Sequence, residues 1–422
     1  MKYYLAIDLG ASSGRHIVGW EENGKIETEE IFRFPNSAVK QDGHLVWDSA
    51  KLLSNVKEGI ALAKKKFGRI ESLAIDSWGV DYVLMNGDEE IWPAYAYRDS
   101  RTDAVIPEVH AQLPFAELYS RTGIQFEHFN TIYQLYADKK AGRLEEATDY
   151  LMTPEYLLYK LCGVKSHEYT LETTGALVNA VTGKYDREII ERLGLPQRLF
   201  GEILPPGTVI GEYEGIKCML CGTHDTASAV EGIPMEGNQP YISSGTWSLL
   251  GVKSPVPVIR TGDQLPEWSN EGGVGCILYL KNIMGMWIVN RLRDELCPDK
   301  AFDEITAQAE ASRFEKTVDP NADIFMAPES MKEAFDQVLG KALPEEGDYF
   351  RCAYRSLALS YMKGIREMEQ NTSVSYDKIY IVGGGARNDF LNRLTQEVSG
   401  KEVIALPIEA AAIGNIKVQM QA

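Results

Sequence analysis

Cysteine is scarce in this chain: six residues among 422 are too few for a disulfide-stabilised scaffold. Positive charge is also in deficit, because 43 lysines and arginines face 61 aspartates and glutamates, for a formal net charge of −18. An acidic surface opposes binding to nucleic acid or anionic membrane, and no basic stripe offsets it. No run of 18 apolar residues occurs, and Asp8 and Gly10 interrupt the first apolar run. We therefore expect a cytoplasmic protein that binds neither nucleic acid nor membrane.

Two motifs with a known chemistry are missing as well. Cys218 and Cys221 lie inside an apolar run, and no second cysteine pair stands at metal-binding spacing, so we interpret them as small buried side chains. The pattern Gly-x-x-x-x-Gly-Lys-Ser/Thr is absent, which excludes a P-loop enzyme. A nucleotide is not excluded, because backbone amides and a metal ion can neutralise phosphates locally.

The length and a hydrophobic content of 44% predict a globular protein of two or three domains. The hairpin signal Asn23-Gly24 joins two of the first strands, and a helix is expected to begin after Asp48 and to end at Gly68. Early strands are expected at residues 3–9, 15–20, 26–34 and 73–76. This order predicts a mixed sheet that starts antiparallel, unlike a Rossmann half.

The second half of the sequence restarts in the same way. Residues 239–251 read as strand, small-residue loop and strand, and they echo residues 4–17. The echo predicts a duplicated fold with a cleft between the copies, although so short a repeat also arises by chance. We expect the domain junction near 233–237. Later elements are expected at 351–369 and 388–399 as helices, and at 379–382 and 402–406 as strands.

Three loops of small residues are candidate phosphate sites, because glycine and serine let backbone amides approach an anion closely. They are Asp8–Arg15, Ser243–Thr246 and Gly383–Gly385. Asp8 offers a carboxylate for Mg²⁺. Plain hairpin turns are the alternative for the first two loops. Three consecutive glycines cost backbone entropy that a plain turn does not require, which favours ligand contact at the third.

An aspartate on a turn in mid-chain is the candidate catalytic group. Asp225 follows the apolar run 216–221, where a lone aspartate is usually a turn or helix cap. The phosphate loops favour a different role, acceptance of a hydroxyl proton during phosphoryl transfer. The segments 77–82 and 97–102 combine aromatic and charged side chains, a mixture that suits a polyol. Core packing of Trp78 and a surface ion-pair cluster around Arg98 are the alternatives.

Eight sequence segments together resemble those of the FGGY carbohydrate kinases of the actin-like ATPase superfamily. They are Asp8–Arg15, Ser77–Tyr82, Arg98–Thr102, Gly222–Thr226, Ser243–Ser248, Lys281–Trp287, Gly383–Asn388 and Glu409–Asn415. The resemblance covers nearly the whole chain. It implies an α/β fold of two actin-like (ribonuclease H-like) ATPase domains with a central cleft. Residues 1–234 would be mainly sugar-binding and 235–422 mainly ATP-binding.

The resemblance also implies a set of site residues. Asp225 would be the general base, with Mg²⁺ near Asp8. Asn290 stands where the family suggests a glutamine, so its contact with ATP would be shorter or lost. The sugar contacts would be Gly79, His224, Asp225, Thr226 and Asn282. The ATP contacts would be Ala11, Ser12, Ser13, Gly14, Arg15, Thr246, Asn290, Gly384 and Gly385.

Strings at 78–81, 222–226 and 281–285 indicate the branch of the family that phosphorylates the ketose L-rhamnulose at O1. A kinase for another sugar, such as L-fuculose or xylulose, is one alternative. A non-catalytic actin-like nucleotide-binding protein and an inactive remnant are the others. Family members usually continue beyond the position of Ala422, so a shortened second domain is expected. The expected partners are a ketose and ATP, and the expected assembly is a monomer or homodimer.

Overall fold

The computed structural model describes residues 1–260 and 267–422. These residues form two compact units. The first comprises Met1–Pro234, Ser254–Tyr279 and Glu409–Ala422, and the second comprises Met235–Lys253 and Leu280–Ile408. Two segments expected in the second domain are therefore grouped with the first unit. None of the described helices is both long and apolar enough to cross a membrane.

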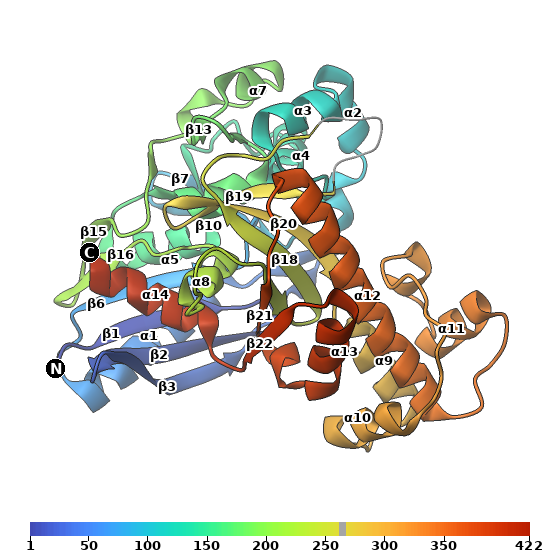
Figure 1. The fold of residues 1–422 in the computed structure, drawn as a ribbon. Coiled ribbons are helices and arrows are strands. Elements are labelled where there is room, and N and C mark those ends of the chain that lie inside the picture. Colours follow the sequence, from blue (N-terminus) through green and yellow to red (C-terminus); the bar gives the residue numbers. More distant parts are fainter. Residues whose placement is uncertain (261–266) are drawn as a thin grey trace. The chain divides into compact units, whose positions relative to one another are not determined.

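A six-stranded mixed sheet forms the centre of the first unit (Figure 1). Strand β1 pairs antiparallel with β2 and parallel with β6, and β6 pairs parallel with β16. The sheet order is β15 (Val209–Tyr213), β16 (Ile216–Met219), β6 (Ser72–Ser77), β1 (Tyr4–Leu9), β2 (Ser13–Glu22) and β3 (Lys25–Pro35).

Helices cover both faces of this sheet, which explains why β1 is apolar at nearly every position. Leu5 and Ile7 pack with helices α1 (Ser49–Phe67) and α5 (Thr153–Cys162) in one core. Ala6, on the opposite face, packs against α14 (Ala410–Gln421). Helix α14 also packs on α8 (Asp225–Gly232), and Figure 1 shows it beside β1.

A second core of the first unit lies among the elements between β6 and β15. Its short strands pair as β10-β7-β8, β4-β5-β9, β11-β14 and β12-β13. The helices are η1 (Ser100–Thr102), α2 (Ile106–Gln112), α3 (Phe115–Thr122), α4 (Thr131–Lys140), α6 (Tyr169–Glu172), η2 (Thr173–Gly175), α7 (Arg187–Arg192) and η3 (Gln197–Leu199). The strands are β4 (Val39–Gln41), β5 (His44–Trp47), β7 (Tyr82–Asn86), β8 (Glu89–Ile91), β9 (Ala94–Tyr95), β10 (Asp149–Met152), β11 (His167–Glu168), β12 (Val178–Asn179), β13 (Lys184–Tyr185) and β14 (Ile203–Leu204).

The second sheet repeats the connectivity of the first. Strand β17 pairs antiparallel with β18 and parallel with β21, which pairs parallel with β22, as β1 does with β2, β6 and β16. This repetition is the duplication that the echo predicts. The sheet order is β19 (Ser269–Gly273), β20 (Cys276–Met284), β18 (Trp247–Ser254), β17 (Tyr241–Ser244), β21 (Lys378–Val382) and β22 (Glu402–Leu406). The helices are α9 (Trp287–Leu296), α10 (Phe302–Ala311), η4 (Asp323–Phe325), α11 (Met331–Leu339), α12 (Glu346–Thr372), η5 (Gly384–Arg387) and α13 (Asp389–Ser399).

Local signals in the sequence account for several boundaries. The Asp48 side chain accepts a hydrogen bond from the backbone N–H of Lys51, and Gly68 ends α1 with φ of 74°. The hairpin of β4 and β5 was missed, although its turn residues Asp42 and Gly43 both have positive φ and form the Asp-Gly pair typical of such turns.

Two glycines allow α14 to approach α8 closely, and this approach generates a prediction. A Cβ on Gly414 would lie 1.8 Å from the Ser228 carbonyl oxygen, and one on Gly232 would lie 2.0 Å from the carbonyl oxygen of Ala410. Gly414→Ala is therefore expected to lower the free energy of unfolding by about 1–3 kcal/mol or more, as overpacking does. Urea unfolding measures this change. Gln421→Ala, on an exposed residue of the same helix, should stay within about 0.5 kcal/mol of wild type. Equal losses for the two variants would contradict the close packing.

Candidate active site

Three aspartates stand at the carboxyl ends of the parallel strands of the first unit. Asp8 on β1 is directly opposite Asp76 on β6. Asp225 begins α8, and the preceding residue His224 forms a parallel bridge with Ser77. Burial raises the pKa of each aspartate, and the charge of Asp8 raises the pKa of both Asp76 and Asp225 further. The three carboxylates are therefore close enough to repel one another.

Asp8 is held by an arginine from the neighbouring strand. The Nε and Nη2 groups of Arg15 donate to Asp8 Oδ2 at 2.9 and 2.7 Å. A further nitrogen of Arg15 forms an ion pair with Glu409. Burial raises the pKa of Asp8, whereas Arg15 opposes that rise. The guanidinium of Arg15, an expected ATP contact, is thus engaged by two carboxylates of its own unit.

Asp76 is the aspartate that the sequence interpretation missed. It is completely buried, and its Oδ2 accepts a hydrogen bond of 2.6 Å from Asn415 Nδ2 on α14. Its Oδ1 has no hydrogen-bond partner. The signal was present, because Leu-Ala-Ile-Asp occurs at both 5–8 and 73–76 and the two copies pair residue for residue.

These carboxylates are suited to a hard cation. The Oδ1 atom of Asp76 has no hydrogen-bond partner, and Asp8 stands directly opposite on the neighbouring strand. Within the described ranges, only Glu155, His167 and Glu172 form a group of three potential ligand atoms within 4.8 Å. Asp8, Asp76 and Asp225 are therefore too widely spaced to form a direct three-carboxylate cage. Mg²⁺ suits such spacing, because it binds one or two carboxylates and retains several waters.

Asp225 lies on a turn whose shape is fixed by neighbouring side chains. About a third of its side chain, 36%, is exposed, and its Oδ1 accepts a hydrogen bond of 3.2 Å from Thr226 Oγ1. His224 Nε2 lies 3.5 Å from the same oxygen. Burial raises the pKa of Asp225, and the neighbouring His224 opposes the rise. The turn thus presents a partly accessible carboxylate beside an imidazole.

Two further segments of the first unit contact this turn. The backbone N–H of His224 donates to Thr170 Oγ1 at 3.1 Å, and Ser77 N–H donates to the carbonyl of Thr223 at 2.9 Å. A Cβ on Gly79 would lie 2.7 Å from Thr174 Oγ1, so Gly79 packs closely on the short helices after β11. The structure thereby brings together Gly79, His224, Asp225 and Thr226 from the expected sugar contacts.

The turn after Gly79 is strained and braced. Val80 has φ of 67°, a conformation that β-branched residues rarely adopt. Its carbonyl accepts hydrogen bonds from Thr131 Oγ1 at 2.9 Å and Gln134 Nε2 at 3.2 Å, and its N–H donates to Thr174 Oγ1 at 3.2 Å. Backbone strain of this kind costs about 1–3 kcal/mol and is found most often at ligand sites.

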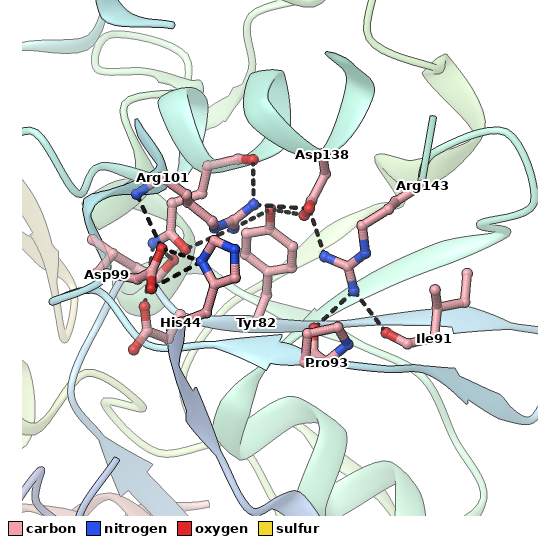
Figure 2. A network of polar contacts seen from close by, with 11 residues as sticks. His44, Tyr82, Ile91, Pro93, Asp99, Arg101, Asp138 and Arg143 are labelled. Atoms are coloured by element: carbon pink, nitrogen blue, oxygen red, sulfur yellow. Dashed lines mark hydrogen bonds and ion pairs between the residues drawn. The ribbon is translucent and has the colours of Figure 1, made fainter. Parts of the chain in front are cut away.

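Gln134 belongs to a buried ionic network that anchors this bracing (Figure 2). Arg101 and Arg143 converge on Asp138 Oδ1 at 2.8 and 2.5 Å, and Tyr82 donates to Asp138 Oδ2 at 2.6 Å. Arg101 also donates to Gln134 Oε1 at 3.2 Å. The network connects η1 and α4 to the turn at residues 78–82 and fixes the position of that turn.

Asp81 holds the neighbouring aromatic residues in place through hydrogen bonds. Its Oδ2 accepts hydrogen bonds from the indoles of Trp47 and Trp78 at 2.6 and 3.0 Å and from Tyr97 N–H at 3.1 Å. Burial raises the pKa of Asp81 to about 6, although these donors lower it. Trp78 is only 8% exposed, and its ring packs against that of Trp47 at an interplanar angle of 38°. It therefore lies in the core, which is the alternative to a sugar contact given above. Arg98 is exposed and contacts Tyr97.

Of the segment Ala11–Arg15, Ala11 and Ser12 lie in the tight hairpin turn between β1 and β2, and the other three residues begin β2. Gly10 N–H donates to the Ser13 carbonyl at 2.9 Å, and Asn36 Nδ2 donates to the Gly10 carbonyl at 2.9 Å. Asn36 is a second residue that the sequence interpretation missed. Ser12 is exposed, whereas Gly14 is buried against the ring of Phe34.

The second unit contains a cavity of about 600 Å³ that collects the expected ATP residues of this unit. Its walls include Thr246, Asn290, Gly384 and Gly385, all four of the expected contacts in this unit. Asn282, an expected sugar contact, lies on β20 and is not part of this wall. The remaining lining residues are Gly245, Met286, Phe302, Asp303, Thr306, Ala307, Glu310, Arg387, Asn388, Asp389, Phe390 and Arg393.

The three consecutive glycines beside this cavity have different surroundings. A Cβ on Gly385 would lie 2.0 Å from Ser244 Oγ, and one on Gly383 would lie 2.7 Å from the Ser244 carbonyl. A Cβ on Gly384 would meet no atom within 4 Å. Gly383 and Gly385 are therefore required for packing on β17, and of the three glycines only Gly384 could take a Cβ without a clash.

The loop with Thr246 is braced by the start of α9. Met286 N–H donates to the Gly245 carbonyl at 2.8 Å, and Trp287 N–H donates to the Thr246 carbonyl at 3.2 Å. A Cβ on Gly285 would lie 2.7 Å from the Thr246 carbonyl. The string Lys281–Trp287 therefore shapes a turn that leaves Thr246 exposed at the cavity.

Comparison with known proteins identifies the same two halves. Residues 3–232 match the N-terminal domain of the FGGY family of carbohydrate kinases, and residues 240–422 match its C-terminal domain. A rhamnulokinase of Oceanobacillus iheyensis is 40% identical over 99% of this chain and 93% of its own length. A rhamnulokinase of Mannheimia succiniciproducens is 41% identical over 99% of this chain and 89% of its own length.

Solved structures share the fold at low sequence identity. A gluconate kinase from Lactobacillus acidophilus matches with a TM-score of 0.81 at 16% identity, over 100% of this chain and 89% of that one. A glycerol kinase from Plasmodium falciparum with ADP matches with a TM-score of 0.79 at 14% identity, over 99% and 89%. The expected fold class of two actin-like α/β domains is confirmed.

The raised pKa of Asp76 makes a prediction for stability. The native state retains a proton that the unfolded state releases, so stability falls as pH rises from the unfolded pKa of about 3.9 through the raised native one. Asp76→Asn should flatten this fall above about pH 4, by about 1.4 kcal/mol for each pH unit that the shift spans. Urea unfolding without divalent cations measures it.

The matched control is Asp42→Asn, which changes an exposed aspartate on a turn where asparagine tolerates positive φ. It should keep the wild-type dependence on pH. If Asp76→Asn also keeps it, Asp76 is not a carboxyl with a raised pKa.

Proposed function

We propose, because this chain belongs to the FGGY family of carbohydrate kinases, that it transfers the γ-phosphate of ATP to O1 of L-rhamnulose. The main structural support for this proposal is that Gly79 and the turn His224–Thr226 lie together, next to Asp8 and Asp76. Rhamnulokinases that are 36–41% identical over 99–100% of this chain support the choice of sugar.

The proposed reaction needs one proton acceptor and a positioned phosphate. Asp225 accepts the O1 proton as the sugar oxygen bonds to the γ-phosphorus, while the bond from that phosphorus to the β–γ bridging oxygen breaks and ADP leaves. The partly exposed carboxylate suits this role, because it is accessible to a hydroxyl and still held by Thr226 and His224. Gly79, His224, Thr226 and Asn282 would orient the sugar.

The remaining expected residues would serve the nucleotide. Thr246, Asn290, Gly384 and Gly385 border a cavity large enough for a nucleoside, and Ala11–Arg15 offers a small-residue turn for phosphate oxygens. Asp8, with Asp76 beside it, would hold Mg²⁺, which neutralises charge on the transferring phosphoryl group when bound. An ATP-dependent enzyme of sugar metabolism would act in the cytoplasm. A monomer or homodimer stays a prediction.

Asp225→Asn tests the assignment of the base. The amide cannot accept the O1 proton, so we expect kcat to fall by about 10²–10⁴-fold, the usual contribution of a general base. ADP release is measured with L-rhamnulose, L-fuculose and xylulose in parallel, and sugar binding by calorimetry. Retained sugar binding with lost turnover is the expected pattern.

Three outcomes would contradict parts of this proposal. Undiminished turnover in Asp225→Asn would contradict the assignment of Asp225 as the general base. Stronger stimulation of ADP release by L-fuculose or xylulose than by L-rhamnulose would contradict the proposed sugar substrate. Absence of stimulation by any ketose in the folded wild-type protein, with nucleotide still bound, favours a non-catalytic nucleotide-binding role.

Gly384→Ala tests the nucleotide cavity. Its methyl group enters open space, so the melting temperature should stay at the wild-type value while ADP affinity falls, because the added carbon fills room next to the ligand. Calorimetric titration with ADP measures the affinity. Gly385→Ala is the contrasting variant, since its methyl group would clash with Ser244 and should lower the melting temperature as well. Unchanged ADP affinity in Gly384→Ala would contradict the proposal that the nucleotide binds against this wall of the cavity.

A further inference from the structure

Both ring nitrogens of His224 face carboxylates. Nδ1 lies 3.3 Å from Glu271 Oε2, and Nε2 lies 3.5 Å from Asp225 Oδ1. Neither Nδ1 nor Glu271 Oε2 has a hydrogen bond elsewhere, and both side chains are nearly buried, at 11% and 13% exposure. A neutral imidazole has one acceptor nitrogen, which would face a carboxylate here. The imidazolium, with two N–H donors, is the form that satisfies both neighbours.

Glu271 is held in place by the backbone of its own strand. Gly272 N–H donates to Thr173 Oγ1 at 2.7 Å, and Asn270 N–H donates to the Gly123 carbonyl at 2.8 Å. A Cβ on Gly272 would lie 2.8 Å from the ring of Tyr169. Strand β19 is thus fixed against α6 and η2 on one side of the glutamate and against Gly123, at the end of α3, on the other. The carboxylate of Glu271 therefore reaches the imidazole from a fixed backbone.

A second carboxylate fixes the backbone of the same histidine. His224 N–H donates to Thr170 Oγ1, and that hydroxyl donates to Glu168 Oε2 at 2.6 Å. Glu168 also accepts the N–H of Leu171 at 3.0 Å. The peptide of His224 is therefore oriented independently of Glu271, so the two acidic residues have separable tasks.

We propose that Glu271 is a positioning residue for sugar phosphorylation, and that it acts through His224 by holding the imidazolium between itself and Asp225. This role rests on the proposed function, because it concerns the carboxylate that accepts the sugar proton. A fixed positive ring beside Asp225 would keep this carboxylate ionised and so able to accept the hydroxyl proton. Glu271 contacts Nδ1 of the ring and Asp225 contacts Nε2, so the effect of Glu271 on Asp225 passes through the ring.

The electrostatics of the site agree with this geometry. Burial lowers the pKa of His224, but Glu271, Asp225 and Glu168 outweigh it, and the net effect is a raised pKa. Asp8 and Asp76 act on Asp225 from β1 and β6. If the charged ring is the active form, its activity is present below the raised pKa and is lost as pH rises through it.

Glu271→Gln is the test. It keeps the shape of the side chain and removes its charge, so the basic limb of the kcat/KM profile for the sugar should move to lower pH, with about a tenfold loss at neutral pH. The KM for ATP should stay within about twofold of wild type. Glu271→Asp, which retains the charge, should recover part of the loss. Glu212→Gln on an exposed position of β15 is the matched control and should behave as wild type.

Two further measurements separate this role from a structural one. In a His224→Gln background, Glu271→Gln should cause less than about a twofold additional loss, because its effect passes through the ring. In histidine-labelled protein without sugar, the NMR titration midpoint of His224, identified by its absence in His224→Gln, should be lower in Glu271→Gln. If Glu271→Gln does not fold, Glu271→Asp is measured in the same way and should show a smaller shift.

An unchanged midpoint, or additive losses in the double variant, would overturn the inference. A wild-type protein without ketose-stimulated ADP release would overturn the proposed function instead. The two failures are distinguishable, because the midpoint is measured with neither sugar nor ATP.

Discussion

The parallel pairing of β1 with β6, and of β6 with β16, is the constraint on which the first unit depends. It brings Asp8, Asp76 and the Asp225 turn to one edge of a sheet that is buried on both faces. Buried like charges raise one another's pKa, and each here has one specific opposing partner: Arg15, Asn415 or His224. Much of the surrounding structure serves to position these three partners. Clusters of this kind are unfavourable for folding and are typical of functional sites.

Close backbone packing serves the two units in different ways. In the first unit, Gly232 and Gly414 let two helices touch, and a strained Val80 is held by side chains anchored in the network of Arg101 and Asp138. In the second unit, Gly383 and Gly385 after β21 pack on Ser244, and Gly384 and Gly385 border a cavity. Rigidity is concentrated where a loop must keep its shape without regular secondary structure.

Sequence patterns predicted the parts of the fold that local chemistry determines. The Asp48 cap, the Gly68 stop and the strand at 402–406 follow from residue preferences and periodicity. The site residues were suggested by resemblance, and their roles stay predictions. Asp76 was missed because an aspartate inside a buried strand is read as a strand end until its pairing partner is known. Glu271 carried no local signal, since its proximity to His224 depends on how distant segments fold together.

The covering of the first unit has a consequence for how the chain is made. Gln419 donates to the Leu5 carbonyl at 3.1 Å, and Ile416 packs on the face of β1 that carries Ala6. Helix α14 follows the second unit in the chain, so this face of β1 has no cover while the second unit is being synthesised. Loop closure across more than 400 residues is slow, and exposed apolar strands attract other chains in the meantime. Nascent chains of this protein should therefore depend on chaperones until α14 has been synthesised and can pack on β1.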